Sequence, residues 1–198
     1  TQTVTTGSGS SLVLQGGGGA TNMARIQSYG VTQTVSLNGS ALDLTGGTGT
    51  SLNFARIEAL NGDQFVTGAG AITITGGASG GTTGNGNFAD IRQRNVAKQQ
   101  SVTANTLSII GGASGIENNA TIRGNGIQSV SATSIAIQGG ANGTDNFGQI
   151  NAITSSQTIN VGTGGLSLTG GGGNSTDRRN YASLFQGGLT GTTQTVTV

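Results

Sequence analysis

Cysteine, histidine and proline are all absent from this 198-residue sequence. The lack of cysteine excludes disulfides, thiolate metal sites and cysteine nucleophiles. The lack of histidine removes the commonest general base and the commonest metal ligand. Any catalytic or metal chemistry would therefore have to rest on carboxylates, amides and hydroxyls.

Charge is also scarce, because charged residues make up only 8% of the chain and the net charge is +1. So weak a field is not expected to attract nucleic acid or an anionic membrane. No apolar run of 18 or more residues predicts a membrane span. Glycine is abundant, with 39 residues, but the wealth of Val, Ile, Leu and Thr argues against disorder.

The dominant positive feature is an internal repeat of about 30 residues, a period typical of solenoids and propellers. An apolar-x-apolar-x unit followed by two glycines recurs six times. The first glycines of the pairs are Gly16, Gly46, Gly76, Gly111, Gly139 and Gly170.

Two further blocks recur with the same period. A Gln-x-Val/Ile block begins at Gln2, Gln33, Gln64, Gln100, Gln128, Gln157 and Gln194. A small-x-aliphatic block begins at Ala24, Ala55, Ala89, Ala120, Gly148 and Ala182. The sequence thus holds six full repeats and the beginning of a seventh.

Each block alternates apolar and polar residues and is rich in β-branched residues, which predicts three short strands per repeat. No helical period is present, and repeats of this length are too short for four-stranded propeller blades. We therefore predict an all-β fold: one parallel β-helix domain over residues 1–198, with six coils and a partial seventh. Val35, Leu42, Leu44, Ala55 and Ile57, with their equivalents, are expected to form its interior columns.

Two columns of side chains allow more specific predictions. Gln33 shares a face with Val35, so we expect the seven repeat glutamines to form a hydrogen-bonded amide ladder. Phe54 breaks the alternation set by Ala55 and Ile57; it either caps the core at a corner, the simpler interpretation, or belongs to an outward stripe available for lateral contact. That stripe would comprise Met23, Phe54, Phe88, Phe147 and Tyr181, interrupted by Asn119.

The order of "QTV", "LxLxGG" and "N-aromatic-Ala-x-Ile" resembles the repeat regions of filamentous-haemagglutinin-like exoproteins of two-partner secretion systems. The resemblance extends over nearly the whole chain. It implies a right-handed parallel β-helix, an extracellular location, and a role as an adhesin, biofilm component or surface fibre. Because the secretion domain of such exoproteins is not seen, it also implies an internal fragment or a repeat-only subunit.

The glycine-rich corners do not predict a nucleotide site, because the glycine frames of the phosphate motifs are missing and the same loop occurs six times. We expect these glycines to combine positive φ with close packing of the next coil. No cofactor is expected.

Carboxylates give one candidate metal or catalytic pair. Glu117 and Asp145 occupy equivalent positions in adjacent repeats, with Asp177 near them, and could hold a cation; a solvated loop edge is the alternative. Asp43, Glu58, Asp63 and Asp90 are expected not to cluster, so we predict that the chain is not an enzyme.

Basic residues gather in the longest insertion, 92–100, where Arg92, Arg94 and Lys98 could contact an acidic partner or a polysaccharide; a solvated loop is the simpler interpretation. Ice binding is a further alternative, although the outward positions of the middle strand form no regular threonine array.

Neither end of the sequence shows a capping element, since it starts and stops in the same strand block. We expect coils to stack end to end or laterally with other copies, or on flanking coils of a longer chain. The predicted function is therefore a structural, extracellular fibre or stalk segment of a bacterial surface adhesin or biofilm matrix protein. A carbohydrate-binding or carbohydrate-active β-helix and an ice-binding solenoid are the alternatives.

Overall fold

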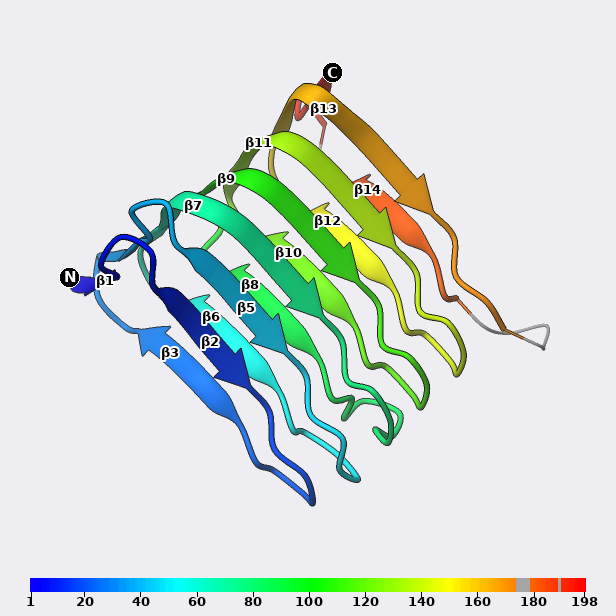
Figure 1. Cartoon of the computed structure of the whole chain (residues 1–198). Coiled ribbons are helices and arrows are strands. Elements are labelled where there is room, and N and C mark those ends of the chain that lie inside the picture. Colours follow the sequence, from blue (N-terminus) through cyan, green and yellow to red (C-terminus); the bar gives the residue numbers. More distant parts are fainter. Residues whose placement is uncertain (174–178, 189) are drawn as a thin grey trace.

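The computed structural model describes residues 1–173, 179–188 and 190–198. It is a parallel β-helix whose coils lie side by side along one axis, with the two ends of the chain at opposite ends of the stack (Figure 1). Two parallel sheets form its sides. The fold class predicted from the repeat is confirmed.

The first sheet has nine strands, contributed by the glutamine block and the Gly-Gly block of each repeat. Its strands are β1 (Gln2–Thr5), β2 (Ser11–Gln15), β4 (Thr32–Ser36), β5 (Ala41–Thr45), β7 (Asp63–Thr75), β9 (Gln99–Ile110), β11 (Ile127–Gln138), β13 (Gln157–Thr169) and β15 (Gln194–Thr197).

The second sheet has six strands, one from each small-x-aliphatic block. They are β3 (Ala24–Ser28), β6 (Ala55–Ala59), β8 (Ala89–Gln93), β10 (Ala120–Gly124), β12 (Gly148–Ala152) and β14 (Ala182–Gln186). Equivalent residues pair in register from coil to coil, so each block becomes a column along the axis.

The structure differs from the prediction of three strands per coil in one respect. In coils one and two the first two blocks are separate strands, but from β7 onward they run as one bent strand. Six residues lie between Val35 and Leu42, and a turn closed by the Ser40 N–H donating to the Leu37 carbonyl interrupts the ladder there. Only four residues lie between Val102 and Leu107. The shorter connection leaves no room for the turn, so the ladder continues through the bend.

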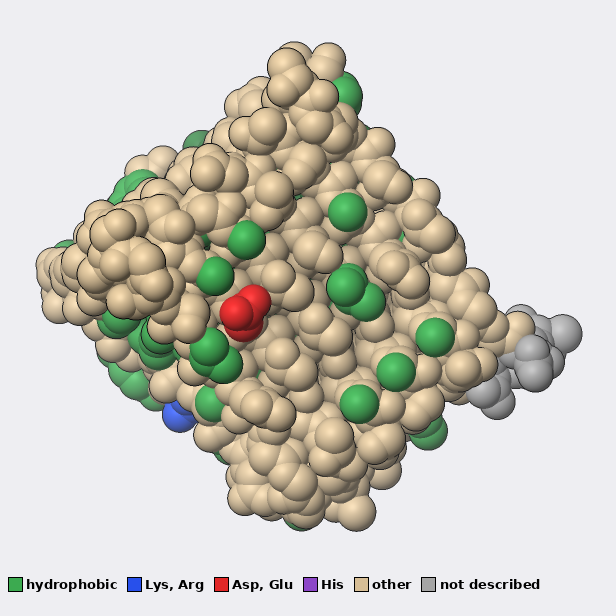
Figure 2. Space-filling model, in the orientation of Figure 1, with side chains coloured by type: hydrophobic (Ala, Val, Ile, Leu, Met, Phe, Trp, Pro, Cys, Tyr) green, Lys and Arg blue, Asp and Glu red, His purple; other side chains and the backbone are tan. Residues whose placement is uncertain are grey.

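The core lies between the sheets and is made of the predicted columns. Val35, Leu42, Leu44, Ala55 and Ile57 all have 0% exposure, which confirms their inward direction. The outer face of the first sheet is mostly uncharged, with scattered hydrophobic side chains and a single acidic patch (Figure 2). Burial of the aliphatic columns supplies the main favourable free energy of folding.

The glutamine column comprises the seven repeat glutamines and runs along the edge of the core. From Gln33 onward, each Nε2 donates to the Oε1 of the glutamine in the preceding coil, at 2.5–2.8 Å. The same nitrogens also donate to carbonyls of the second sheet, as Gln100 does to Ile91. The column therefore ties successive coils together and joins the two sheets.

A second amide column, which we did not predict, follows the glycine corners. It comprises Asn22, Asn53, Asn87, Asn118, Asn146 and Asn180. Each of the first five donates its backbone N–H to the Oδ1 of the asparagine in the next coil, at 2.7–2.9 Å. From Asn53 onward, each Nδ2 donates to a glycine carbonyl of the coil before it.

The glycine corners fit directly against this asparagine column. A methyl group added at Gly76 would come within 1.9 Å of the Asn118 carbonyl oxygen, and one at Gly46 within 2.2 Å of that of Asn87. Neither of these two glycines has a positive φ, whereas Gly19, Gly80, Gly115 and Gly143 of the same corners do, so the expectation of positive φ holds for only some of the corner glycines. At Gly46 and Gly76 it is contact with the next coil that requires glycine.

Candidate functional site

The outer face of the second sheet concentrates the few charges of the chain. Its strands present two outward positions per coil, and four of the eight basic residues, together with two of the seven acidic ones, occupy them. These residues are Arg25, Arg56, Arg92, Arg123, Glu58 and Asp90. This face is consequently the most distinctive surface of the described chain.

The outer aromatic column borders this face and comprises Met23, Phe54, Phe88, Phe147 and Tyr181, with Asn119 at the equivalent position of the fourth coil. Asn53 and Ala55 point inward on either side of Phe54, so the alternation simply continues and Phe54 points outward. The expected core-capping corner is therefore wrong. Phe54 is only 6% exposed because Phe88 and Arg56 cover it from outside.

The rings of this column form two separate stacks. Phe54 and Phe88 lie 4.7 Å apart with their planes at 7°, and Phe147 and Tyr181 lie 4.9 Å apart at 2°. The Arg56 guanidinium lies 4.7 Å from the centre of the Phe88 ring, within the range of a cation–π contact. Asn119 separates the two stacks.

Arg56 also organises the acidic residues of this face. Its Nε and Nη2 donate to the two carboxylate oxygens of Asp90 at 2.6 and 2.7 Å, and its Nη1 lies 3.7 Å from Glu58 Oε1. Glu58 and Asp90 therefore share one guanidinium, so the expectation that these acids lie apart is wrong. Burial raises the pKa of Asp90, and the hydrogen bonds and charge of Arg56 oppose that rise.

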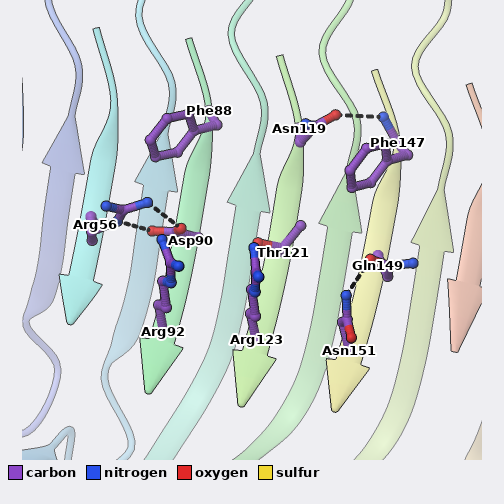
Figure 3. A pocket seen from close by; sticks show the side chains of 10 residues that line it. All are labelled: Arg56, Phe88, Asp90, Arg92, Asn119, Thr121, Arg123, Phe147, Gln149 and Asn151. Atoms are coloured by element: carbon purple, nitrogen blue, oxygen red, sulfur yellow. Dashed lines mark hydrogen bonds and ion pairs between the residues drawn. The ribbon is translucent and has the colours of Figure 1, made fainter. Parts of the chain in front are cut away.

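A pocket of about 250 Å³ lies on this face at the level of Asn119 (Figure 3). Phe88 and Phe147 stand on its two sides. Arg56, Asp90, Arg92, Asn119, Thr121, Arg123, Gln149 and Asn151 complete its lining. The Asn119 side chain is held toward its neighbour, because its Oδ1 accepts a hydrogen bond from the Phe147 backbone N–H at 3.1 Å.

Two arginines of the pocket are not neutralised by a hydrogen-bonded acid. The Nε atoms of Arg92 and Arg123 are buried without a hydrogen-bond partner. Burial lowers the pKa of both, and for Arg92 the neighbouring Arg123 lowers it further. Arg92 lies within β8, so the predicted basic insertion begins only at Arg94, whose Nη1 lies 3.8 Å from Glu58 Oε1.

The candidate pair Glu117 and Asp145 lies at adjacent corners, away from this pocket, with both residues at positive φ. Their carboxylates take separate partners. Glu117 Oε2 accepts from the Gly84 N–H at 2.8 Å, and Asp145 Oδ1 accepts from Arg179 Nε at 2.8 Å. No group of three or more acidic residues that could hold a metal ion is found among the described residues, and Asp177 lies outside them.

Comparison of the chain with protein-family models, with curated proteins and with solved structures finds no match in any of the three. In the part of the chain that the structure describes, no helix is long and apolar enough to cross a membrane.

Proposed function

We propose that this chain is a structural rod: an extracellular fibre or stalk segment of a filamentous-haemagglutinin-like bacterial surface adhesin or biofilm matrix protein. The observation that carries the proposal is the glutamine column, whose hydrogen bonds link all seven glutamines from one end of the solenoid to the other. Together with the backbone ladders, it joins each coil to the next by hydrogen bonds, so that a pulling force can pass from coil to coil. The order of the sequence blocks supports the family.

Open strand edges support association with further coils. In the described structure β1, β3, β14 and β15 each pair with a neighbour on one side only. Such edges present backbone N–H and C=O groups that can add another strand. The partner would be a second copy of this chain, or further coils of the same chain.

Electron microscopy and analytical ultracentrifugation of the purified chain test the self-assembling form of the proposal. We expect filaments one solenoid wide, with the roughly 4.8 Å repeat of stacked strands along their axis. A compact monomer at every concentration would contradict self-assembly. Cleavage of a polysaccharide by the purified chain would contradict a structural role.

Two variants distinguish end-to-end from lateral association. Because the Gln157 N–H donates to the Thr193 carbonyl, the backbone of Val196 faces away from β13. Val196→Pro removes an outward N–H and should shorten the filaments. Phe185→Ser, on the exposed outer face of β14, should leave filament length unchanged and reduce only side-by-side bundling.

A further inference from the structure

The outer aromatic column is interrupted at one position, and the interruption leaves a gap bounded by two aromatic faces. Phe88 uses one face against Phe54, and Phe147 uses one face against Tyr181. Their other faces are directed toward the coil that carries Asn119 (Figure 3). We call this gap, between Phe88 and Phe147 and above Asn119, the slot.

The slot has room for one further ring. Two coil steps of about 4.8 Å place the two phenyl rings roughly 9.6 Å apart. Rings one coil apart already stack with their centroids 4.7–4.9 Å apart, so a flat ring or a sugar ring can contact both Phe88 and Phe147. The polar groups beside the slot decide between the two.

The chemistry next to the slot selects the substituents of that ring. Thr121, Gln149 and Asn119 line the pocket with a hydroxyl and two amides, which suit the hydroxyls of a sugar. The pocket volume of about 250 Å³ lies below the ~300–1,000 Å³ of drug-sized sites, so it has room for a single ring unit.

The charge of the pocket requires an anionic group on the ligand. Of its four charged residues, Arg56 and Asp90 neutralise each other, whereas Arg92 and Arg123 leave two positive charges. Both arginine side chains run back along their strands toward the slot (Figure 3). A planar carboxylate can accept hydrogen bonds from guanidinium groups in a charge-assisted geometry, and would supply the partner that both Nε atoms lack.

We propose that the slot binds one hexuronic acid unit of an acidic polysaccharide, with its ring between Phe88 and Phe147 and its carboxylate on Arg92 and Arg123. The inference goes beyond the structural role proposed above, since a rod can exist without a ligand site. It would make this coil the point at which the rod holds an acidic matrix or surface polysaccharide.

Isothermal titration calorimetry with acidic trisaccharides tests the proposal. The probes are the trisaccharides of galacturonic, glucuronic, mannuronic and guluronic acid, with the methyl ester of each as the uncharged counterpart. We expect at least one acid to bind, its methyl ester to bind at least tenfold more weakly, and the affinity to fall as salt is added. Failure of all four acids to bind would overturn the proposal.

Variants locate the binding site. Asn119→Phe should fill the slot and abolish binding. Asn119→Ala loses the same hydrogen bond to Phe147 and one amide of the pocket but leaves the slot open, so it should bind more weakly than the parent chain without losing binding. Arg123→Gln should weaken binding at least tenfold. Arg25→Gln removes the same charge from an exposed position of the same sheet face and should have no effect.

Three results would contradict the assignment. Unchanged binding by Asn119→Phe would place the ligand elsewhere, and equal losses in Arg25→Gln and Arg123→Gln would indicate a nonspecific charge effect. Tighter binding of AMP than of every trisaccharide would show that the slot takes a flat base instead. Circular dichroism of each variant, compared with the parent chain, verifies that the solenoid is intact.

Discussion

At the scale of single residues, an uncharged amide is the side chain that can repeat indefinitely along a parallel stack. It accepts a hydrogen bond from one neighbour and donates one to the other. In a buried column of identical amides, each side chain therefore finds hydrogen-bond partners within the column. A carboxylate in the same column would face like charges, and an aliphatic side chain would leave its neighbours without partners. This explains why glutamine occupies this position in all seven coils although it is fully or almost fully buried in the inner ones.

Breaking the glutamine column in its middle should therefore cost more than losing one hydrogen bond. In Gln100→Leu, Gln64 Oε1 and the Ile91 carbonyl lose a donor, and Gln128 Nε2 loses an acceptor. Unpaired buried groups cost about 1–3 kcal/mol each. Because Gln128 Nε2 keeps the Asn151 carbonyl as a partner, we count two such groups and expect the free energy of unfolding to fall by about 2–4 kcal/mol.

Urea titration followed by circular dichroism measures this change. The matched control is Gln99→Leu, at the exposed neighbouring position, which should stay within about 0.5 kcal/mol of the parent chain. Equal losses in the two variants would show that the ladder contributes no special stability.

The glycine corners provide a second prediction at this scale. In Gly76→Ala the new methyl group meets backbone of the next coil, which cannot rotate away, so we expect a loss of about 3 kcal/mol or more in the free energy of unfolding. Gly170 occupies the same column in the sixth coil, but a methyl group there meets no atom within 4 Å.

Gly170→Ala should accordingly be neutral, or stabilising by up to about 1 kcal/mol through the unfolded chain. Thermal unfolding of both variants checks the comparison. If both alanines are equally harmful, the requirement for glycine comes from the corner itself and not from the coil stacked on it.

At the scale of elements, strands and interior columns could be predicted because each repeat block shows its own alternation. In the sequence, Ala55 and Ile57 are separated by the polar Arg56, and this alternation predicts that both apolar side chains point inward. The fusion of two blocks into β7 was not predicted, because it depends on whether a few connecting residues close a turn, which period and composition do not specify.

The asparagine column leaves a signal in the sequence. An asparagine directly precedes the outer aromatic position in all six repeats, but asparagine in a glycine-rich turn is also ordinary turn chemistry. Its role emerges only when the coils are superposed, because its partners lie 28 to 38 residues away in the chain. The recurrence of asparagine at the same position of every repeat is the feature that predicts a structural role for this residue.

The pocket could be predicted only in part. Asn119 stood out as an interruption of the aromatic stripe, but nothing in the sequence showed that the Arg92 and Arg123 side chains turn toward it. The meeting of Glu58 and Asp90 at Arg56 was missed because they occupy different positions of their repeats. Arg56 lies directly opposite Asp90 on the neighbouring strand and two residues before Glu58 on its own strand, so one guanidinium reaches both acids.

At the scale of the whole molecule, the coils are units that contact mainly their neighbours, so one coil should be removable. Deleting residues 100–127 joins Gln99 to Gln128 and keeps every column in register. We expect a folded solenoid of one coil fewer, with lower stability because one interface between coils is lost.

The same deletion should also abolish ligand binding. It removes Asn119, Thr121 and Arg123 and brings Phe147 next to Phe88, so the aromatic column becomes continuous and trisaccharide binding should disappear. Circular dichroism and calorimetry measure the two effects. An unfolded product would contradict the independence of the coils, and retained binding would contradict the location of the slot.

The glutamine column also gives the molecule a direction. From Gln33 onward, each glutamine directs one side-chain N–H to the oxygen of the coil before it, and its own oxygen accepts from the coil after it, so the amide dipoles add along the axis instead of cancelling. One end of the stack therefore offers donors and the other offers acceptors. Two copies could continue each other's ladders only when they point the same way, and a fibre built from them would be polar along its entire length.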